Sequence, residues 1–361
     1  MKEENARSKA IAAYPMKSGE GPYSYHNNSS AQREAIDVAK ALVSKTIAEN
    51  LDVSIPSKSF LLADLGCSVG ANTIIAVENI IEAVELKYKC LNSSKIPKFQ
   101  VFFNDFATND FNMLFKSLHQ DKKYYAAGVP GSFYGCLFPE ASLHLVHSSF
   151  SLHWLSRVPE KVVDESSCSM NKGRIFYSNS GEEVVNAYKA QYEKDMAKFL
   201  QARAEEVVDG GLMLLNIYGI PNGIPHSESW SGRTIELLGG CLMDMARKGK
   251  VSEEKVNSFN IPIYLMCPRE FEEAVEQNGD FSIEKMEILP RKNSLIPHEI
   301  ATSRRAIFEE IIKEEFGEDI IEELFDMYLR KLEETDPSYL GESAEKSIVF
   351  FVLLKRKASS Y

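Results

Sequence analysis

The sequence predicts an α/β protein in which a parallel sheet carries helices on both faces and a helical cap lies over the sheet. Two patterns support this prediction. Up to about residue 218, short apolar runs of strand length alternate with longer segments whose apolar residues recur at helical spacing, as in sheets with crossover helices. Beyond that point the chain is mostly helical, apart from one late β-branched and aromatic run. With 361 residues, 44% of them hydrophobic, the chain can bury a core of this size.

The same patterns place the individual elements. We expect strands at residues 60–63, 99–103, 142–146 and 212–218, the first two of which are followed closely by an aspartate. We expect helices with one apolar face at residues 34–49, 72–88 and 183–208. The cap is predicted from helical stretches at 231–248 and 303–334, and the run 347–354 is expected to return to the sheet. A cleft between such a sheet and its cap is a common place for a ligand.

Charge and composition exclude several classes of function. The chain has 41 Lys and Arg against 52 Asp and Glu, a net charge of −11. We therefore expect neither nucleic acid nor an anionic membrane as a partner, since both reward clustered basic residues. The longest apolar run, residues 348–354, is much shorter than the roughly 20 residues of a membrane span. No secretory signal is visible, and six cysteines without a C-x-x-C pair indicate reduced thiols. These features predict a cytoplasmic protein.

A glycine turn at residues 64–72 follows the first strand and is the first candidate for a ligand site. It matches neither the G-x-G-x-x-G pattern of dinucleotide sites nor the P-loop, which disfavours a nicotinamide dehydrogenase. A turn of this kind suits a nucleoside without a phosphate bridge, such as S-adenosylmethionine. Asp105, at the end of the second strand, could accept hydrogen bonds from both ribose hydroxyls. A generic strand-to-helix turn is the alternative interpretation.

Several longer motifs carry a resemblance to the plant SABATH methyltransferases. They occupy residues 23–29, 64–68, 102–106, 109–112, 128–134 and 147–156, and the resemblance extends from about residue 14 to 357. That family transfers methyl groups from S-adenosylmethionine to small carboxylic acids such as salicylate, jasmonate, indole acetate, gibberellins and loganic acid. One branch methylates ring nitrogens of xanthine alkaloids. The resemblance implies a Rossmann-like methyltransferase sheet with a helical cap, a carboxyl methyltransferase activity toward a small plant acid, and a homodimer.

We divide the chain accordingly into a core and a cap. Residues 34–215 would form the core that binds S-adenosylmethionine, completed by roughly 262–292 and 345–358. Residues 1–33, 216–261 and 293–344 would form an N-terminal arm and a helical cap around the substrate pocket.

The resemblance assigns one group of residues to the methyl donor. Asp105 would hold the ribose, Phe106 and Phe133 would flank the adenine, and Ser132 could bond to its edge. The other residues of the donor site would be Tyr25, Ser29, Asp64, Cys67 and Asn72. Without the motif, Phe106 and Phe133 would read as core aromatics and Cys67 as a small buried filler.

Gln32 and Trp154 match the pair that holds the substrate carboxylate in this family, and we give them the catalytic role. A carboxylate has a pKa near ~4 and is ionised at neutral pH. It therefore needs alignment with the sulfonium methyl and exclusion of water, but no general base. The amide and the indole supply neutral N–H donors for this purpose. Further substrate contacts are assigned to Tyr25, Phe150, His153, Tyr218, Ile235 and Arg304. A satisfied core histidine is the alternative for His153.

The expected pocket departs from that of the salicylate enzymes. Those enzymes carry Tyr, Leu, Trp, Met and Phe where this chain has Phe150, Tyr218, Ile235, Arg304 and Ser347. We expect salicylate and benzoate to be poor substrates and the natural acid to be larger or more polar. Arg304 either points inward, where it could bind a second carboxylate, hydroxyl or carbonyl oxygen, or lies on the surface with Arg305 against the core. Loganic acid enzymes carry a His at the position of Ile235, which leaves the acid open.

We expect no metal site. His144 and His147 have H-x-x-H spacing, but on a strand their side chains face opposite ways. Some family members are described with Mg2+ near an Asn and an Asp-x-Phe-Asn segment, which correspond here to Asn171 and residues 257–260. Asn257 stands where the Asp would be and removes the charged ligand that Mg2+ prefers.

Two other functions stay open from the sequence. The chain could be an N-methyltransferase for a xanthine-like or other heterocyclic nitrogen. It could also be a silent binding protein for a hormone-like acid, although the intact Asp64, Asn72 and Asp105 speak against this.

Overall fold

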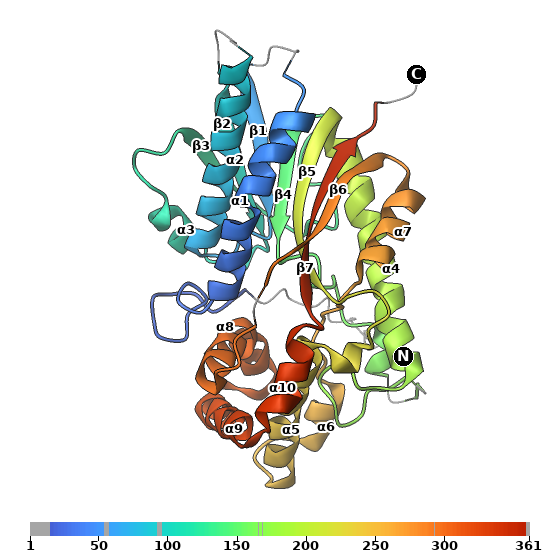
Figure 1. The fold of residues 1–361 in the computed structure, drawn as a ribbon. Coiled ribbons are helices and arrows are strands. Elements are labelled where there is room, and N and C mark those ends of the chain that lie inside the picture. Colours follow the sequence, from blue (N-terminus) through green and yellow to red (C-terminus); the bar gives the residue numbers. More distant parts are fainter. Residues whose placement is uncertain are drawn as a thin grey trace, which may run out of the picture.

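A seven-stranded sheet forms the centre of the computed structural model, which describes residues 15–53, 58–91, 96–164, 166–167, 169–291 and 293–358. The strands lie in the order β3-β2-β1-β4-β5-β7-β6 (Figure 1). Their bounds are β1 Ser59–Leu65, β2 Lys98–Asp105, β3 Tyr124–Pro130, β4 Leu143–Ser149, β5 Val207–Gly219, β6 Phe281–Leu289 and β7 Ile348–Arg356. The four predicted early strands are present as β1, β2, β4 and β5, and the run 347–354 is β7.

The sheet is mixed, whereas we expected a parallel one. Strands β1 to β5 pair in parallel, but β7 runs antiparallel to both of its neighbours, β5 and β6. The reason lies in the path of the chain. β5 runs toward the cap and ends at Gly219, and Ile348 at the start of β7 pairs with this glycine. β7 therefore enters the sheet from the cap side and must run the opposite way.

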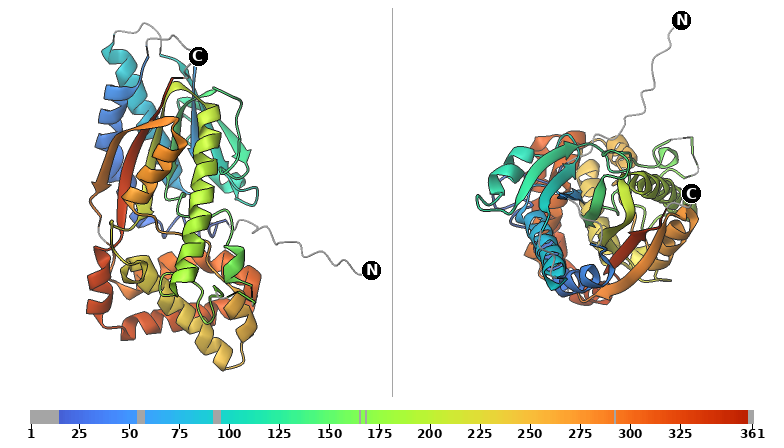
Figure 2. Two further views of the ribbon diagram at one scale, coloured as in Figure 1. Left: turned by 90° about the vertical axis from the view of Figure 1, so that its right-hand side faces the viewer. Right: turned by 90° about the horizontal axis from the view of Figure 1, so that it is seen from above.

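Helices cover both faces of the sheet, as predicted. α1 (Ser30–Asn50) and α2 (Ala71–Cys90) pack together on one face, and α4 (Glu182–Glu206) and α7 (Pro268–Asn278) lie on the other (Figure 2). The short α3 (Phe111–Ser117) joins β2 to β3. Its first turn is capped by Asp110, which accepts a hydrogen bond from the Met113 N–H at 2.9 Å.

The remaining helices form a separate layer below the sheet in Figure 1. They are α5 Trp230–Arg247, α6 Glu253–Ser258, α8 Pro297–Phe316, α9 Ile321–Glu334 and α10 Pro337–Ala344, with single 3-10 turns at Glu160–Val162, His226–Glu228 and Glu318–Ile320. The single helical stretch expected at 303–334 is two helices, because Gly317 adopts a φ of +91° that ends α8. We refer to this layer as the cap. No helix among the described residues is long and apolar enough to cross a membrane.

Two strands were not expected from the sequence. β3 is an edge strand of sequence YYAAGVP whose Tyr125 is exposed, and β6 is the opposite edge strand, with several exposed side chains. Edge strands lose one hydrogen-bonding neighbour and part of their burial, so their residues follow the strand pattern less closely.

Candidate active site

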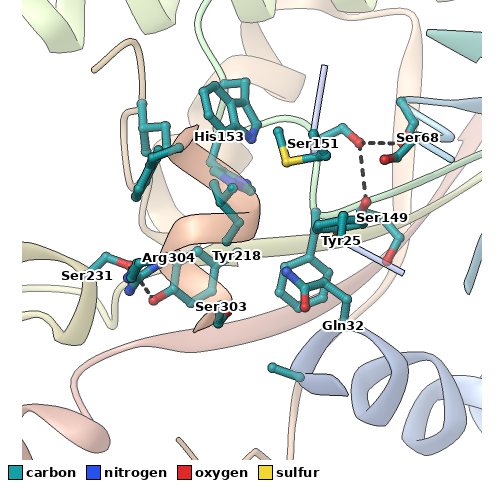
Figure 3. Close-up of a pocket in the computed structure, with 18 of the residues that line it drawn as sticks. Tyr25, Gln32, Ser68, Ser149, Ser151, His153, Tyr218, Ser231, Ser303 and Arg304 are labelled. Atoms are coloured by element: carbon teal, nitrogen blue, oxygen red, sulfur yellow. Dashed lines mark hydrogen bonds between the residues drawn. The ribbon is translucent and has the colours of Figure 1, made fainter. Parts of the chain in front are cut away.

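A cavity opens between the sheet and the cap, where β1, β2 and β4 end (Figure 3). Gly66, Asp105 and Ser149, which stand at or directly after those strand ends, line it from the sheet side. Arg304 on α8 and Ile235 on α5 line it from the cap side. A smaller recess continues from this cavity around the glycine turn. The carboxyl ends of parallel strands therefore carry the candidate site, as is usual in open α/β sheets.

Asp105 is anchored by two backbone amides at the end of β2. The Ser68 N–H donates to Oδ2 at 2.7 Å and the Phe106 N–H donates to Oδ1 at 2.8 Å. Burial raises the pKa of Asp105 to about 6; the two N–H bonds oppose this rise and nearby Asp64 adds to it. Each oxygen keeps a lone pair for a further donor, such as a hydroxyl.

The glycine turn is shaped to leave backbone, and not side chain, at the cavity wall. Gly66 has a φ of +79°, and a Cβ there would meet the Ser151 hydroxyl oxygen at 2.1 Å. Ser68 adopts a φ of +52°, which is uncommon for a residue other than glycine. In this conformation the Ser68 N–H donates to Asp105, so an unfavourable backbone conformation is retained where it fixes a candidate binding group.

The smaller recess is lined by Asp64, Cys67 and Asn72. Asp64 is buried and accepts hydrogen bonds from the Thr73 hydroxyl and, at 2.5 Å, from His147 Nδ1. The Asn72 amide donates to Oγ and to the carbonyl of Ser29, at 3.0 and 3.2 Å. Burial, with Asp105 and Asp64 nearby, raises the pKa of the Cys67 thiol, so Cys67 stays protonated.

Of the three residues expected around the adenine, the two aromatic ones line the cavity, whereas Ser132 does not. Phe106 and Phe133 both line the main cavity, and Phe133 is held by Tyr134 and Phe199 at ring distances of 4.7 and 6.0 Å. Ser132 belongs to neither cavity lining, and its hydroxyl accepts from the Tyr134 N–H at 3.3 Å. Ser29 also lies outside both linings, and its hydroxyl accepts a hydrogen bond from Asn72, which lines the smaller recess.

These residues fit S-adenosylmethionine. The Asp105 carboxylate is fixed and has free lone pairs for ribose hydroxyls, and the turn offers bare backbone at Gly66. The buried Ser68 hydroxyl has no hydrogen-bond partner among the described residues and faces the same cavity. An orphaned polar atom in a cavity is expected where a ligand completes the hydrogen bonding.

The same cavity is lined by the residues expected to bind the carboxylate and by their neighbours: Gln32, Trp154, His153 and Tyr25. Gln32 Oε1 and His153 Nδ1 are buried and find no partner in the described part of the chain. Trp154 is held by a β-bridge to Ile263. Burial, together with the charges of two arginines, lowers the pKa of His153 to about 3, so its imidazole is neutral. Burial raises the pKa of Tyr25, and its phenol stays protonated.

The cavity is also lined by Phe150, Tyr218, Ile235 and Arg304. The rings of Phe150 and Tyr218 stack at 5.9 Å, the edge of Tyr218 meets His153 at 5.6 Å, and Ile235 is buried. Of the two orientations considered for Arg304, the structure has the inward one. Its guanidinium donates to the hydroxyls of Thr234 (2.8 Å) and Ser231 (3.2 Å) on α5. Figure 3 shows Arg304 beside Ser231.

Arg291 is a site residue that the sequence did not reveal. It follows β6, in a segment without a motif, and its side chain enters the cavity and lies over the Tyr218 ring at 4.6 Å. Burial would raise the pKa of Tyr218, but the positive charges of Arg291 and Arg304 outweigh it and the net direction is down. No spacing rule could identify Arg291, because only the folded chain brings it to Tyr218.

The positions considered for a metal have other contacts. His144 Nδ1 accepts from the Leu61 N–H at 3.1 Å, whereas His147 bonds to Asp64, so the two imidazoles serve different partners. Asn171 donates to Asn260 Oδ1 at 2.8 Å.

Ser347 accepts from the Trp230 N–H at 3.1 Å and does not line the main cavity.

Comparison with known proteins agrees with this geometry. Residues 12–357 match the family described as SAM dependent carboxyl methyltransferase. The chain belongs to this family. It is 43% identical over 359 residues to a loganic acid O-methyltransferase of Catharanthus roseus, covering 97% of this chain and 96% of that protein. It is 37% identical over 347 residues to a farnesoic acid carboxyl-O-methyltransferase of Arabidopsis thaliana, covering 95% and 99%.

A solved structure of the carboxyl methyltransferase family has the same fold. A loganic acid methyltransferase with SAH superimposes with a TM-score of 0.91 at 42% identity, covering 96% of this chain and 99% of that one. The SABATH resemblance and the predicted α/β fold are thereby confirmed. So is the activity: the protein is an S-adenosylmethionine-dependent carboxyl O-methyltransferase of plant small-molecule acids.

Proposed function

We propose that this methyltransferase esterifies an acid larger or more polar than salicylate or benzoate, and that Gln32 and Trp154 hold the reacting carboxylate. The observation that carries this is the pair of orphaned buried atoms, Gln32 Oε1 and His153 Nδ1, in the cavity that Trp154 shares. A half-turn of the Gln32 amide exchanges its oxygen for an N–H donor, which a carboxylate could accept.

S-adenosylmethionine supplies the electrophilic methyl group when it is bound. Asp105 and the 66–68 turn would hold the donor at the strand ends. Gln32 and Trp154 orient one carboxylate oxygen toward that methyl, and the neutral His153 adds no charge that would neutralise it. The aromatic walls, such as Phe150 and Phe308, exclude water from the carboxylate. No residue has to remove a proton, because the acid is already ionised.

The cap side of the cavity supports an acid beyond the salicylate size. Ile235 and Arg304 replace two of the large apolar residues expected of a small aromatic pocket, and Arg304 brings a charge into the cavity. Two relatives are named for loganic acid and farnesoic acid, which are both larger than salicylate.

A methyl-transfer screen tests this function. The pure protein is incubated with radiolabelled S-adenosylmethionine and a panel of acids: salicylate, benzoate, jasmonate, indole acetate, gibberellins, loganic acid, farnesoate and nicotinate, with xanthines added. We expect base-labile label on a large or polar acid and little on salicylate or benzoate. Base-stable label on a xanthine would contradict the carboxylate role and move the function to nitrogen methylation.

Substitutions of the proposed clamp refine the test. Trp154→Phe and Gln32→Met each remove a hydrogen bond to a charged oxygen, so kcat/KM for the acid should fall roughly 10- to 100-fold. The affinity for S-adenosylhomocysteine, measured by calorimetry, should stay unchanged and serves as the folding control. Unchanged kcat/KM in both variants would remove these residues from the proposed mechanism.

We also infer a homodimer that works in the cytoplasm. The family resemblance supports the dimer, and a mass of one chain by light scattering would contradict it. Five cysteines, Cys67, Cys90, Cys136, Cys241 and Cys267, are free thiols, which fits a reducing compartment; the sixth, Cys168, lies outside the described residues. Fractionation of cells that express the protein would test the compartment.

A further inference from the structure

Two arginines enter the acceptor end of the cavity from different elements. Arg304 comes from α8, and Arg291 comes from the connection between β6 and α8. In Figure 3, Arg304 lies with Ser231 and Tyr218 on one side of the pocket, and Gln32 and Tyr25 lie on the other. The cavity therefore has a cationic end, separate from the end where the carboxylate would be methylated.

Neither arginine of this cationic end has an anionic partner within the described part of the chain. Arg304 donates to the neutral hydroxyls of Thr234 and Ser231 and also interacts with the neutral phenol of Tyr328. Arg291 Nε and Nη1 are buried and make no hydrogen bond to any described residue, and the guanidinium rests on the ring of Tyr218. Burying a charge without a partner costs free energy.

Elsewhere the same chain pairs its buried arginines. Arg203 binds Glu206 at 2.7 Å, and Arg305, the next residue after Arg304, binds Glu309 at 2.6 Å. Among the described residues, Arg291 and Arg304 thus differ from the buried Arg203 and Arg305, which are each paired with a carboxylate. A bound anionic ligand would supply the partner that Arg291 and Arg304 lack there.

The acids near this end do not neutralise it. Glu299 also lines the cavity, but within the described part of the chain it forms no ion pair with either arginine, and its carboxylate accepts from the Ser294 hydroxyl at 2.5 Å. Glu34 is exposed and acts on Arg291 only through a weak attraction. A sugar or alcohol hydroxyl could accept one N–H but would leave two positive charges uncompensated, whereas a carboxylate matches the forked donors of arginine in geometry and in charge.

We propose that the natural acceptor is a dicarboxylic acid whose second carboxylate is bound by Arg291 and Arg304. This rests on the function proposed above. The carbon skeleton between the two carboxylates lies along the stacked rings of Phe150 and Tyr218. One carboxylate oxygen forms a bond to the donor's methyl carbon as the sulfur–methyl bond breaks and its electron pair stays on sulfur. The dianion becomes a monoester monoanion, the sulfonium becomes a neutral thioether, and no proton moves.

The test compares matched acids. The intact enzyme is assayed with aliphatic and aromatic dicarboxylic acids and with the monoamide of each, which keeps the shape and removes the second charge. We expect kcat/KM for the best diacid to exceed that of its monoamide by about 100-fold, as a charge-assisted bidentate contact would give. Calorimetry in the presence of S-adenosylhomocysteine should show the same preference in binding.

Variants identify the residues. Arg304→Gln and Arg291→Gln should each lower the ratio of kcat/KM for the diacid to kcat/KM for its monoamide from about 100 toward 1. Arg304→Lys should retain part of the preference, and Arg269→Gln, at an exposed position on α7, is the matched control that should change nothing. Unchanged affinity for S-adenosylhomocysteine confirms that the variants are folded.

The outcomes separate the two proposals. Efficient methylation of monoacids without a preference for diacids, or an equal loss of both in the variants, would overturn the diacid proposal and leave the carboxyl methyltransfer intact. Label on a heterocyclic nitrogen with no acid accepted would overturn the proposed function, and this inference with it.

Discussion

At Asp105 two opposing requirements meet in a single side chain. The carboxylate must be buried to hold a nucleoside, and burial raises its pKa to about 6. The ribose hydroxyls would donate to the ionised form, so donor binding favours loss of the proton. Without donor, the raised pKa means that Asp105 takes up a proton at a higher pH than an ordinary aspartate, and the protonated form predominates below about pH 6. Lowering the pH through 6 should therefore weaken donor binding.

We expect the affinity for S-adenosylhomocysteine to fall between pH 7 and pH 5, by up to about tenfold per pH unit below 6. Asp105→Asn should bind the donor product weakly at both pH values, with a much flatter pH dependence, since the titrating group is gone. Isothermal titration calorimetry at several pH values measures this. Equal affinity of the wild type at pH 5 and pH 7 would show that Asp105 does not control donor binding.

Single residues also limit what the sequence could reveal of the site. Asp105 and Trp154 stand in motifs, so their presence in the cavity could be predicted. Ser132 also stands in a motif, yet its hydroxyl accepts from the Tyr134 N–H and does not line the cavity. Arg291 stands in no motif, and its position depends on how a loop after an edge strand folds back over Tyr218. Motifs record the chain's local chemistry, whereas contacts between distant segments follow only from the fold.

Among the elements, α8 ties the N-terminal arm to the cap. Arg305 on α8 binds Glu309 on the same helix and Glu322 on α9, and its guanidinium lies over the Tyr23 ring of the arm at 3.8 Å. Lys17 of the arm also pairs with Glu309. Because the arm carries Tyr25 into the cavity, this network helps to close the acceptor side.

Glu309→Gln should destabilise this junction strongly. It leaves the buried Arg305 without its one buried charge partner among the described residues, which costs about 3 kcal/mol of unfolding free energy. Glu322→Gln is the control: the Glu322 side chain is 72% exposed, and its loss should cost under about 1 kcal/mol. Urea unfolding followed by circular dichroism compares the two variants. A Glu309 variant no less stable than the Glu322 variant would mean that the network does not support the cap.

The elements show equally well where sequence patterns suffice. The inner strands β1, β2, β4 and β5 are largely buried and were predicted, because burial enforces an apolar run. The edge strands β3 and β6 escaped prediction since one side of each is open to solvent. The division of 303–334 into α8 and α9 depends on one glycine, Gly317, whose positive φ the apolar periodicity does not register.

In the whole molecule, the sheet and the cap share the cavity and one strand. β7 begins shortly after the cap helix α10 and pairs along its length with β5 and β6, so a movement of the cap away from the core would strain this strand. Residues of both layers line the cavity, which makes bound donor a common contact of the two. We therefore expect core and cap to unfold together.

Differential scanning calorimetry with and without S-adenosylhomocysteine tests this coupling. A ligand present at 100 times its Kd stabilises the native state by about 2.7 kcal/mol, which for a chain of this length raises the Tm by roughly 4 °C. The wild type should show one transition that moves as a whole. Asp105→Asn should show one transition that moves much less at the same ligand concentration. Two transitions, of which the ligand moves only one, would mean that the cap unfolds independently and that the donor is held by the core alone.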